Sequence, residues 1–181
     1  LELMPGNKIR KYDTWHAMGQ GATTGSLVVT LEALKEMHLT PEDIQLIQND
    51  TKTCPDTGMA GASRSLYMDG NATIIAANKL LAAMRKEDGT LRTYDEMKAE
   101  GIETKYLGRY ETNTTPGLCR LDPNTGIGDP TPAFTYCLNL AEVEVDTKTG
   151  KTTVLKFTCV DFVGRIGNVD AVNGQAYSGC L

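Results

Sequence analysis

The sequence predicts an α+β fold, in which a layer of helices lies on a mixed β-sheet and an antiparallel hairpin comes near the end of the chain. Three observations indicate this class. The chain begins with a strand–helix–strand order, a long helical run follows, and two strand-like runs then flank a short turn. Because 40% of the 181 residues are hydrophobic, we expect residues 1–181 to form a single domain with its own core.

The first elements are read from short apolar patterns. Residues 8–15 are predicted as a strand whose larger apolar residues are Ile9, Tyr12 and Trp15. A helix ending near Met37 is predicted next, with Thr23 or Thr24 as its N-cap. Four apolar residues share one face of this helix: Leu27, Val28, Leu31 and Leu34. The apolar run at residues 44–47 is predicted as the second strand.

A polar loop and a long helix follow the second strand. The loop at residues 49–61 is rich in Asp, Thr, Pro and Gly, so it lies on the surface or wraps a ligand, and we favour the ligand. The helix is predicted from about Leu66 to Met84. Its small residues should allow close packing on a sheet: Gly70, Ala72, Ala76 and Ala83.

Residues 87–132 are predicted to be a polar insertion and loop, and the insertion is expected to carry no chemistry. Within this stretch, Thr93 and Glu96 match a capping box and predict a short helix that ends before Gly101. Later in this stretch, residues 113–132 are rich in Thr, Pro, Gly and Asp, which is typical of a loop.

The hairpin is predicted from residues 136–146 and 152–162, with a β-bulge near Leu140 and Ala141 where the alternation shifts. Cys159 would be a small core residue on its second strand, because no histidine lies near it in the sequence to activate it. Residues 171–175 read as another loop that enters a helix.

Composition and charge exclude several classes of partner. The net charge is −5, and Lys and Arg are scattered, so we expect no nucleic-acid partner. No apolar run is long enough to span a membrane, so we expect no membrane partner either. The chain begins at Leu1 without an initiator methionine and stops in what reads as an unfinished helix, so we interpret it as a fragment of a larger chain.

The cysteines and histidines predict no metal site built from side chains. Five cysteines are widely spaced without a CxxC pair, which indicates neither a disulfide framework nor a zinc or iron–sulfur motif. Reduced cysteines in the cytoplasm are the simplest interpretation. Only His16 and His38 occur, without clustered ligands, so any metal should arrive inside a cofactor.

Two glycine-rich stretches, residues 18–24 and 58–64, each open a predicted helix. Such helix N-termini present unpaired backbone N–H groups and the positive end of the helix dipole, so each can hold an anion. Taken singly, each stretch is also explained by ordinary turn chemistry. Neither stretch matches the Rossmann fingerprint, and Gly150 lacks the upstream glycine of a P-loop, so the pair suggests a different phosphorylated cofactor.

Specific motifs accompany these loops. They are Met-Gly-Gln-Gly before the first helix, Gly-x-x-Gly-Ala-Ser-Arg before the second, Tyr-Asp-Glu-Met-Lys-Ala, Ala-Glu-Val-Glu-Val-Asp-x-x-Thr-Gly-Lys, and Gly-Gln-x-Tyr-x-Gly. With these motifs the chain, from about Tyr12 to its last residue, resembles the molybdenum cofactor-binding part of the xanthine dehydrogenase/aldehyde oxidase family. Within that family it is most similar to the bacterial molybdenum aldehyde oxidoreductases.

The resemblance implies a molybdopterin cofactor with molybdenum, in its cytosine dinucleotide form. By position, Gln20 matches the glutamine whose amide supports the molybdenum oxo group, and Gly19 and Gly21 let the backbone come close. The second stretch is implied to contact the phosphate or pterin through Gly61, Ala62, Ser63 and Arg64. Arg64 also suits a surface position on the helix. The family's catalytic glutamate lies in a Gly-x-Gly-Glu motif that this sequence lacks, so no catalytic residue is assigned.

The implied function is oxidation of aldehydes to carboxylic acids with oxygen from water, and electrons pass to iron–sulfur clusters elsewhere in the enzyme. The implied partners are the substrate, the remaining molybdenum-binding lobes and an iron–sulfur domain or subunit. These residues alone should be inactive. Two alternatives stay open: the same scaffold hydroxylating a purine or another N-heterocycle, and a non-catalytic structural or degenerate module.

Overall fold

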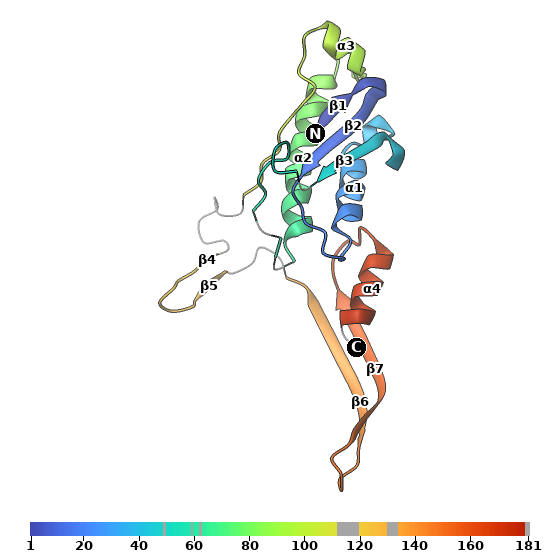
Figure 1. The fold of residues 1–181 in the computed structure, drawn as a ribbon, viewed down its shortest axis with the longest axis vertical. Helices are drawn as coiled ribbons and strands as arrows, with labels where there is room; N and C mark the ends of the chain where they lie inside the picture. Colours follow the sequence, from blue (N-terminus) through green and yellow to red (C-terminus); the bar gives the residue numbers. More distant parts are fainter. Residues whose placement is uncertain (49, 59, 62, 112–119, 130–133, 180–181) are drawn as a thin grey trace. The chain divides into compact units, whose positions relative to one another are not determined.

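The computed structural model describes residues 1–48, 50–58, 60–61, 63–111, 120–129 and 134–179. The chain divides into two compact units, Leu1–Glu111 and Thr112–Leu181, which are described separately (Figure 1). The expectation that residues 1–181 act as one domain within a larger molybdopterin-binding region stays a prediction.

The first unit contains a mixed three-stranded sheet in the order β1-β2-β3. β1 (Glu2–Met4) pairs antiparallel with β2 (Lys8–Asp13), and β2 pairs parallel with β3 (Ile44–Gln48). Parallel neighbours need a crossover connection, and α1 (Ala22–Ala33) lies in that connection. The strand–helix–strand prediction is therefore confirmed.

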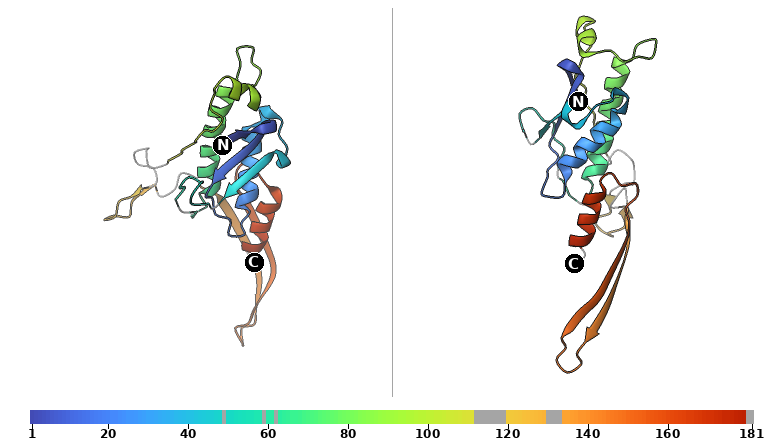
Figure 2. Two further views of the ribbon diagram at one scale, coloured as in Figure 1. Left: turned by 45° about the horizontal axis from the view of Figure 1, so that its top comes forward. Right: turned by 90° about the vertical axis from the view of Figure 1, so that its right-hand side faces the viewer.

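Two longer helices, α1 and α2 (Ser65–Met84), cover one face of the sheet (Figure 2). Short 3₁₀ turns occupy Pro5–Asn7, Lys35–Met37 and Pro41–Asp43. α3 (Tyr94–Ala99) begins with the predicted capping box, in which the Thr93 hydroxyl accepts from the Glu96 N–H and the Glu96 carboxylate accepts from the Thr93 N–H.

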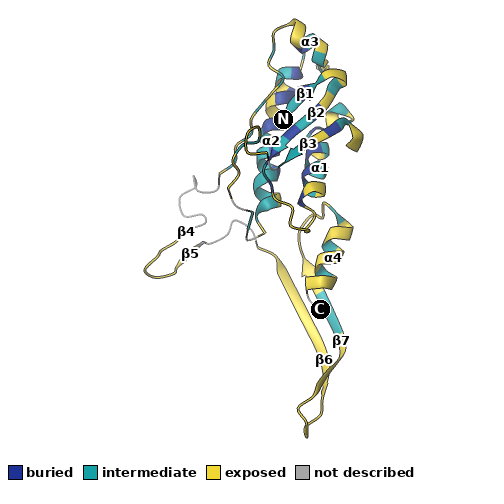
Figure 3. Ribbon diagram, viewed as in Figure 1, coloured by how far each residue is buried: buried dark blue, intermediate teal, exposed yellow. Residues whose placement is uncertain are grey.

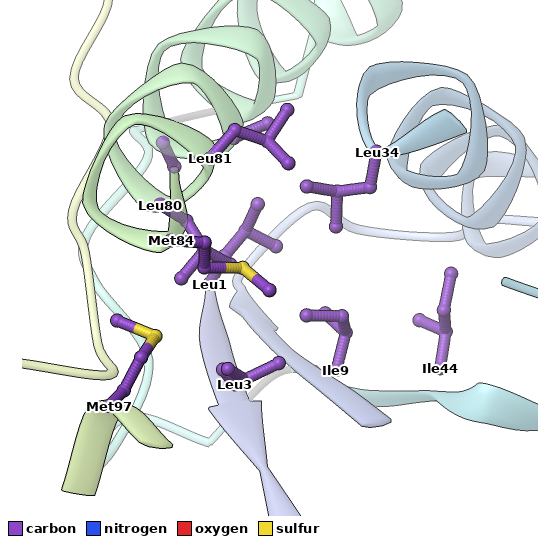
Figure 4. Close-up of a cluster of buried hydrophobic side chains, with 11 residues drawn as sticks. Leu1, Leu3, Ile9, Leu34, Ile44, Leu80, Leu81, Met84 and Met97 are labelled. Atoms are coloured by element: carbon purple, nitrogen blue, oxygen red, sulfur yellow. The ribbon is translucent and has the colours of Figure 1, made fainter. Parts of the chain in front are cut away.

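The core of the first unit lies between the sheet and these helices (Figure 4). Leu3 and Ile9 from the strands meet Leu34 from the end of α1 and Leu80 from α2, and all four side chains are fully buried. The α+β class with two layers is thus confirmed for this unit.

Ala76 packs in the core together with sheet residues, as predicted, and small residues of α2 also serve other neighbours. Gly70 faces α1, because a Cβ built on it would lie 3.9 Å from Cγ1 of Val29. Gly108 approaches α2 so closely that a Cβ built on it would lie 1.8 Å from the Ala72 carbonyl oxygen. Ala72 and Ala76 therefore leave room for the returning chain at residue 108.

The second unit is built on the predicted antiparallel hairpin, whose strands are β6 (Tyr136–Val145) and β7 (Thr152–Phe162). It also contains the short pair β4 (Arg120–Leu121) and β5 (Gly128–Asp129), and α4 (Val169–Gly179). None of its described residues is buried, as Figure 3 shows.

Three details of the second unit differ from the sequence predictions. The register shift lies between Glu142 and Val143, two residues beyond the predicted bulge. Cys159 is half-buried and its thiol donates to Asp161, so it is not a core residue. Residues 171–175 lie inside α4, because the Asn-Gly pair that suggests a loop is accommodated in a helix that begins at Val169.

Candidate functional site

The two glycine-rich loops meet at one edge of the sheet of the first unit. The loop at residues 14–21 leaves the carboxyl end of β2, and the second loop, described at residues 50–58, 60–61 and 63–64, follows the carboxyl end of β3. β2 and β3 are parallel, so these two ends lie side by side. This is the edge at which open α/β sheets commonly bind ligands.

Hydrogen bonds join the two loops directly. The Thr14 hydroxyl donates to the Pro55 carbonyl at 2.9 Å and lies 2.7 Å from the Thr57 hydroxyl. The Thr23 hydroxyl donates to the side-chain carbonyl of Gln48, at the end of β3. The structure therefore brings together the loops that the sequence singled out separately.

The N-termini of α1 and α2 leave their first N–H groups available. The N-cap of α1 is Gly21, and neither Thr23 nor Thr24 caps it, because the Thr23 hydroxyl is turned towards Gln48. Among the described residues, no side chain caps either helix and no acidic residue lies in either first turn. Gly19 and Gly21 have φ angles of 102° and 82°, a conformation that strains any residue with a side chain.

The Gln20 side chain folds back on its own loop. Its amide oxygen accepts from the Met18 N–H, and its Nε2 donates to the His16 carbonyl at 2.9 Å. An amide nitrogen carries two N–H donors, so one remains for a ligand. Gln20 is exposed in this arrangement, which suits a residue at the surface of a binding site.

The second loop ends in a tight turn before α2. Ser63 has a φ of 54°, in the left-handed region that non-glycine residues seldom adopt, and its side chain is exposed. Arg64 is the N-cap of α2 and is half-buried, and its Nη2 would lie 3.7 Å from a Cβ built on Gly58. Its guanidinium thus folds over the loop. Gly61 accepts a backbone hydrogen bond from Arg64, whereas Ala62 lies outside the described residues.

The acidic side chains of the second loop are engaged within the loop itself. Asp50 accepts from the Lys52 N–H and the Thr53 hydroxyl, and these bonds hold the pKa of its carboxyl below the usual value. Asp56 accepts from the Gly58 N–H at 2.9 Å. Both carboxylates are thus committed to shaping the loop, and the anion-binding capacity of this edge rests on backbone N–H groups.

A buried ionic cluster lies beneath the loops, and sequence reasoning missed it. The Lys11 ammonium lies 2.7 Å from an oxygen of Asp69 and 3.4 Å from an oxygen of Asp13. Burial raises the pKa of the Asp69 carboxyl, and the nearby Lys11 opposes that rise. A signal was available: Ile9, Lys11 and Asp13 alternate along one strand, so they share the face of β2 that carries a core residue.

Trp15 is the second feature that sequence reasoning missed. Trp15 is 5% exposed. Its indole lies against α1, because a Cβ built on Gly25 would be 4.0 Å from the indole ring. The same Cβ would also be 4.0 Å from the side chain of Leu66 in α2. The indole Nε1 is buried and has no hydrogen-bond partner. An orphaned donor on a residue that packs at the N-terminal turn of α1 fits an oxygen-rich, anionic group at this edge.

Other candidate sites give little. The described residues contain no cluster of side chains that could hold a metal ion, and among them Cys54 and Cys137 are free. Within the same residues, none of the helices combines the length and apolar character that a membrane crossing needs. A shallow hollow of about 300 Å³ after α3, lined by residues 98 and 101–105, shares no residue with the glycine-rich loops.

Comparisons with known proteins agree with this geometry. Residues 1–181 match the family described as the molybdopterin cofactor-binding domain. The chain is 38% identical to the aldehyde oxidoreductase of Megalodesulfovibrio gigas, over 98% of this chain and 19% of that protein. It is 30% identical to the probable hypoxanthine oxidase XdhD of Escherichia coli K12, over 92% of this chain and 19% of that protein.

Solved structures give the same result. The aldehyde oxidoreductase of Desulfovibrio desulfuricans matches with a TM-score of 0.89 and 40% identity, over 98% of this chain and 19% of that chain. The Cu,Mo-CO dehydrogenase matches with a TM-score of 0.67 at 19% identity, which shows a shared fold. The chain thus spans about a fifth of the length of the relatives that it matches.

Proposed function

The chain belongs to the family of molybdopterin cofactor-binding domains of molybdenum hydroxylases, and from this premise we propose that its two glycine-rich loops hold the phosphate-bearing part of the cofactor. One observation carries the proposal. The uncapped N-termini of α1 and α2 lie at the same edge of the sheet, and their loops are hydrogen-bonded through Thr14 to Pro55 and Thr57.

Each site residue has a role set by its chemistry. The backbone N–H groups around Gly19, Gly21 and Gly61 bind phosphate oxygens together with the Ser63 hydroxyl, and Ala62 is proposed for the same role. The Arg64 guanidinium adds a fixed positive charge over the loop. These groups bind and orient the cofactor without taking part in bond changes.

Gln20 is assigned to the molybdenum end of the cofactor. The free N–H of its amide would donate a hydrogen bond to an oxygen of the bound cofactor and would favour negative charge on that oxygen. The bonds that Gln20 makes to Met18 and His16 hold its amide in one orientation. The cofactor, when bound, supplies the redox chemistry by which oxygen from water is added to a substrate.

The proposed substrate class is an aldehyde, oxidised to a carboxylic acid. The higher identity to aldehyde oxidoreductases, 38–40%, than to the probable hypoxanthine oxidase, 30%, supports this choice over an N-heterocycle. The proposal includes the cytosine dinucleotide form of the cofactor, iron–sulfur clusters in another domain or subunit that accept the electrons, and a cytoplasmic location. The runner-up is the same scaffold acting on a purine-like heterocycle.

The proposal is tested by identifying what the native polypeptide carries. The protein is purified from its own host, denatured, and the released small molecules are identified by mass spectrometry. We expect molybdopterin together with cytidine monophosphate. Matured protein that releases neither a pterin nor a nucleotide would favour a structural or degenerate domain.

The role of Gln20 has its own test. Gln20→Ala in the full-length enzyme should lower turnover about tenfold to a hundredfold while the fold and the cofactor content are kept, because one preorganised donor is lost. Gln45→Ala is the matched control, since Gln45 lies on β3 and is exposed, where it accepts from Arg10. Equal turnover of the two variants would remove Gln20 from the site.

A further inference from the structure

The ionic cluster beneath the loops is almost completely withdrawn from solvent. Lys11 is 3% exposed and Asp13 is 2% exposed, although both stand on a strand whose other core residue is Ile9. Burying charges costs several kcal/mol per ion, and replacing a buried pair by apolar residues is often neutral or stabilising. Stability alone is therefore a poor explanation for this arrangement.

The carboxylate of Asp13 contacts the first loop, the end of β3 and α1. Its Oδ1 accepts from the backbone N–H of Trp15 at 3.3 Å, where the first loop starts, and from Gln48 Nε2 at 2.9 Å, where the second loop starts. Its Oδ2 accepts from the Ser26 hydroxyl of α1 at 2.8 Å. All three donors lie close to the loops that bind the cofactor in the proposed function.

Lys11 extends the same connection to α2. Its ammonium donates to Asp69 at 2.7 Å, and Thr73, one turn further along α2, also lies within reach of that carboxylate at 3.5 Å. Two strands, two helices and the start of the first loop thus converge on one cluster of three charges, Lys11, Asp13 and Asp69. Ion pairs with several hydrogen bonds fix orientation more strictly than apolar contacts, which tolerate sliding.

We propose that Asp13, linked to α2 through Lys11, is a positioning residue that sets the N-termini of α1 and α2 and both loops in the arrangement that binds the cofactor. It does not touch the cofactor. It acts through the Trp15 N–H, the Gln48 amide and the Ser26 hydroxyl. This inference rests on the proposed function, because the arrangement that Asp13 would fix matters only if the cofactor binds at this edge of the sheet.

The test compares cofactor content with stability in the native polypeptide that carries this sequence. Asp13→Ala removes all three acceptor bonds, and Asp13→Asn keeps one acceptor oxygen while removing the charge. Met97→Ala is the matched control, because Met97 is fully buried in the same unit but lies on α3, away from the loops. Each protein is assayed for released pterin per folded polypeptide and for its unfolding temperature.

We expect Asp13→Ala to carry about tenfold less cofactor than wild type, an effect typical of residues that orient a ligand's contacts. The cofactor content of Asp13→Asn should lie between those of Asp13→Ala and wild type. Met97→Ala should lower the unfolding temperature at least as much as Asp13→Ala does, yet keep the cofactor content of wild type. Equal content in Asp13→Ala and Met97→Ala would overturn the inference and leave the cluster a purely structural role.

A second measurement covers the case in which Asp13→Ala does not fold. Amide hydrogen exchange is compared in cofactor-free wild type and Asp13→Asn. In Asp13→Asn, amide exchange should be faster than in wild type in residues 14–21 and 50–58, and it should be unchanged in β1. Exchange that is unchanged in both loops would overturn the inference. If native wild-type protein contains no pterin when it is purified, the proposed function is overturned, and the inference with it.

Discussion

The two units of the chain obtain their structure in different ways. Residues 1–111 enclose a core in which Leu3, Ile9 and Leu80 are fully buried, whereas no described residue of the second unit is buried. The first unit is held by contacts between elements distant in sequence. The second is held by backbone pairing between neighbouring strands, which is marginally stable on its own in water.

The hairpin carries apolar side chains on both of its faces. Before the shift, the pairs Tyr136–Phe162 and Leu138–Val160 lie on one face, and all four side chains are more than half exposed. Beyond the shift, Val143 pairs with Val154 on the opposite face. Local pairing determines this strand geometry without burying the side chains that it presents. Stability should therefore be sensitive to side chains in the first unit and insensitive to them in the second.

The largest contrast should come from truncating one leucine in each unit. Leu80→Ala should lower the free energy of unfolding of the 181-residue chain by about 2–5 kcal/mol, because it leaves a cavity in the core. Leu138→Ala, at a side chain that is 66% exposed, should change it by less than about 0.5 kcal/mol. Denaturant titration followed by Trp15 fluorescence measures the first unit selectively, because Trp15 is the single tryptophan. Equal losses would show that the two units unfold as one.

The same glycine-to-alanine change should have opposite signs in the two units. Gly108→Ala should destabilise the first unit by about 1–3 kcal/mol, because its Cβ would collide with the Ala72 carbonyl and the backbone must shift. Gly174→Ala should stabilise α4 by about 0.5–1 kcal/mol, since it removes a glycine from a helix with open space around it. Thermal unfolding followed by circular dichroism checks both, and a stable Gly108→Ala would contradict the close approach to α2.

The smallest contrast concerns acid. The Lys86 ammonium and then the Thr93 N–H lower the pKa of Glu96 from 4.5 to about 2. A carboxyl with a lowered folded-state pKa stabilises the fold above its unfolded pKa, and this contribution is lost as the pH falls from about 4.5 towards 2. Glu96→Gln should therefore be less stable than wild type at pH 6 and equal to it near pH 2. Asp146→Asn, in the hairpin turn, is the control that should leave Trp15-monitored unfolding unchanged at both pH values.

Sequence patterns predicted the local elements well. The apolar face of α2, the capping box at Thr93 and the alternation of the hairpin strands each reflect interactions within a few residues, and each is present. The prediction that Thr23 or Thr24 is the N-cap of α1 was wrong, because the N-cap is Gly21 and the Thr23 hydroxyl donates to Gln48 at the end of β3. The close approach at Gly108 was missed for the same reason, since its neighbour Ala72 is distant in sequence.

The candidate site likewise has features that the sequence predicted and features that it did not. The two glycine-rich stretches could be found from their composition before helices, and the structure brings their loops together at one edge of the sheet. The residues beneath them were missed, because hydropathy places Lys11 and Asp13 at the surface although both alternate with Ile9 along β2. Their burial depends on Ser26 and Asp69, which come from helices later in the chain. The roles of Gln20, Gly61, Ala62, Ser63 and Arg64 towards the cofactor stay predictions.

A crystal structure of the native full-length polypeptide with its cofactor tests the central claim most directly. Anomalous scattering at the molybdenum edge locates the metal, and the electron density locates the pterin and its phosphates. The account predicts phosphate oxygens at the N-termini of α1 and α2 and the metal near the Gln20 amide. A cofactor whose phosphates touch neither glycine-rich loop would contradict it.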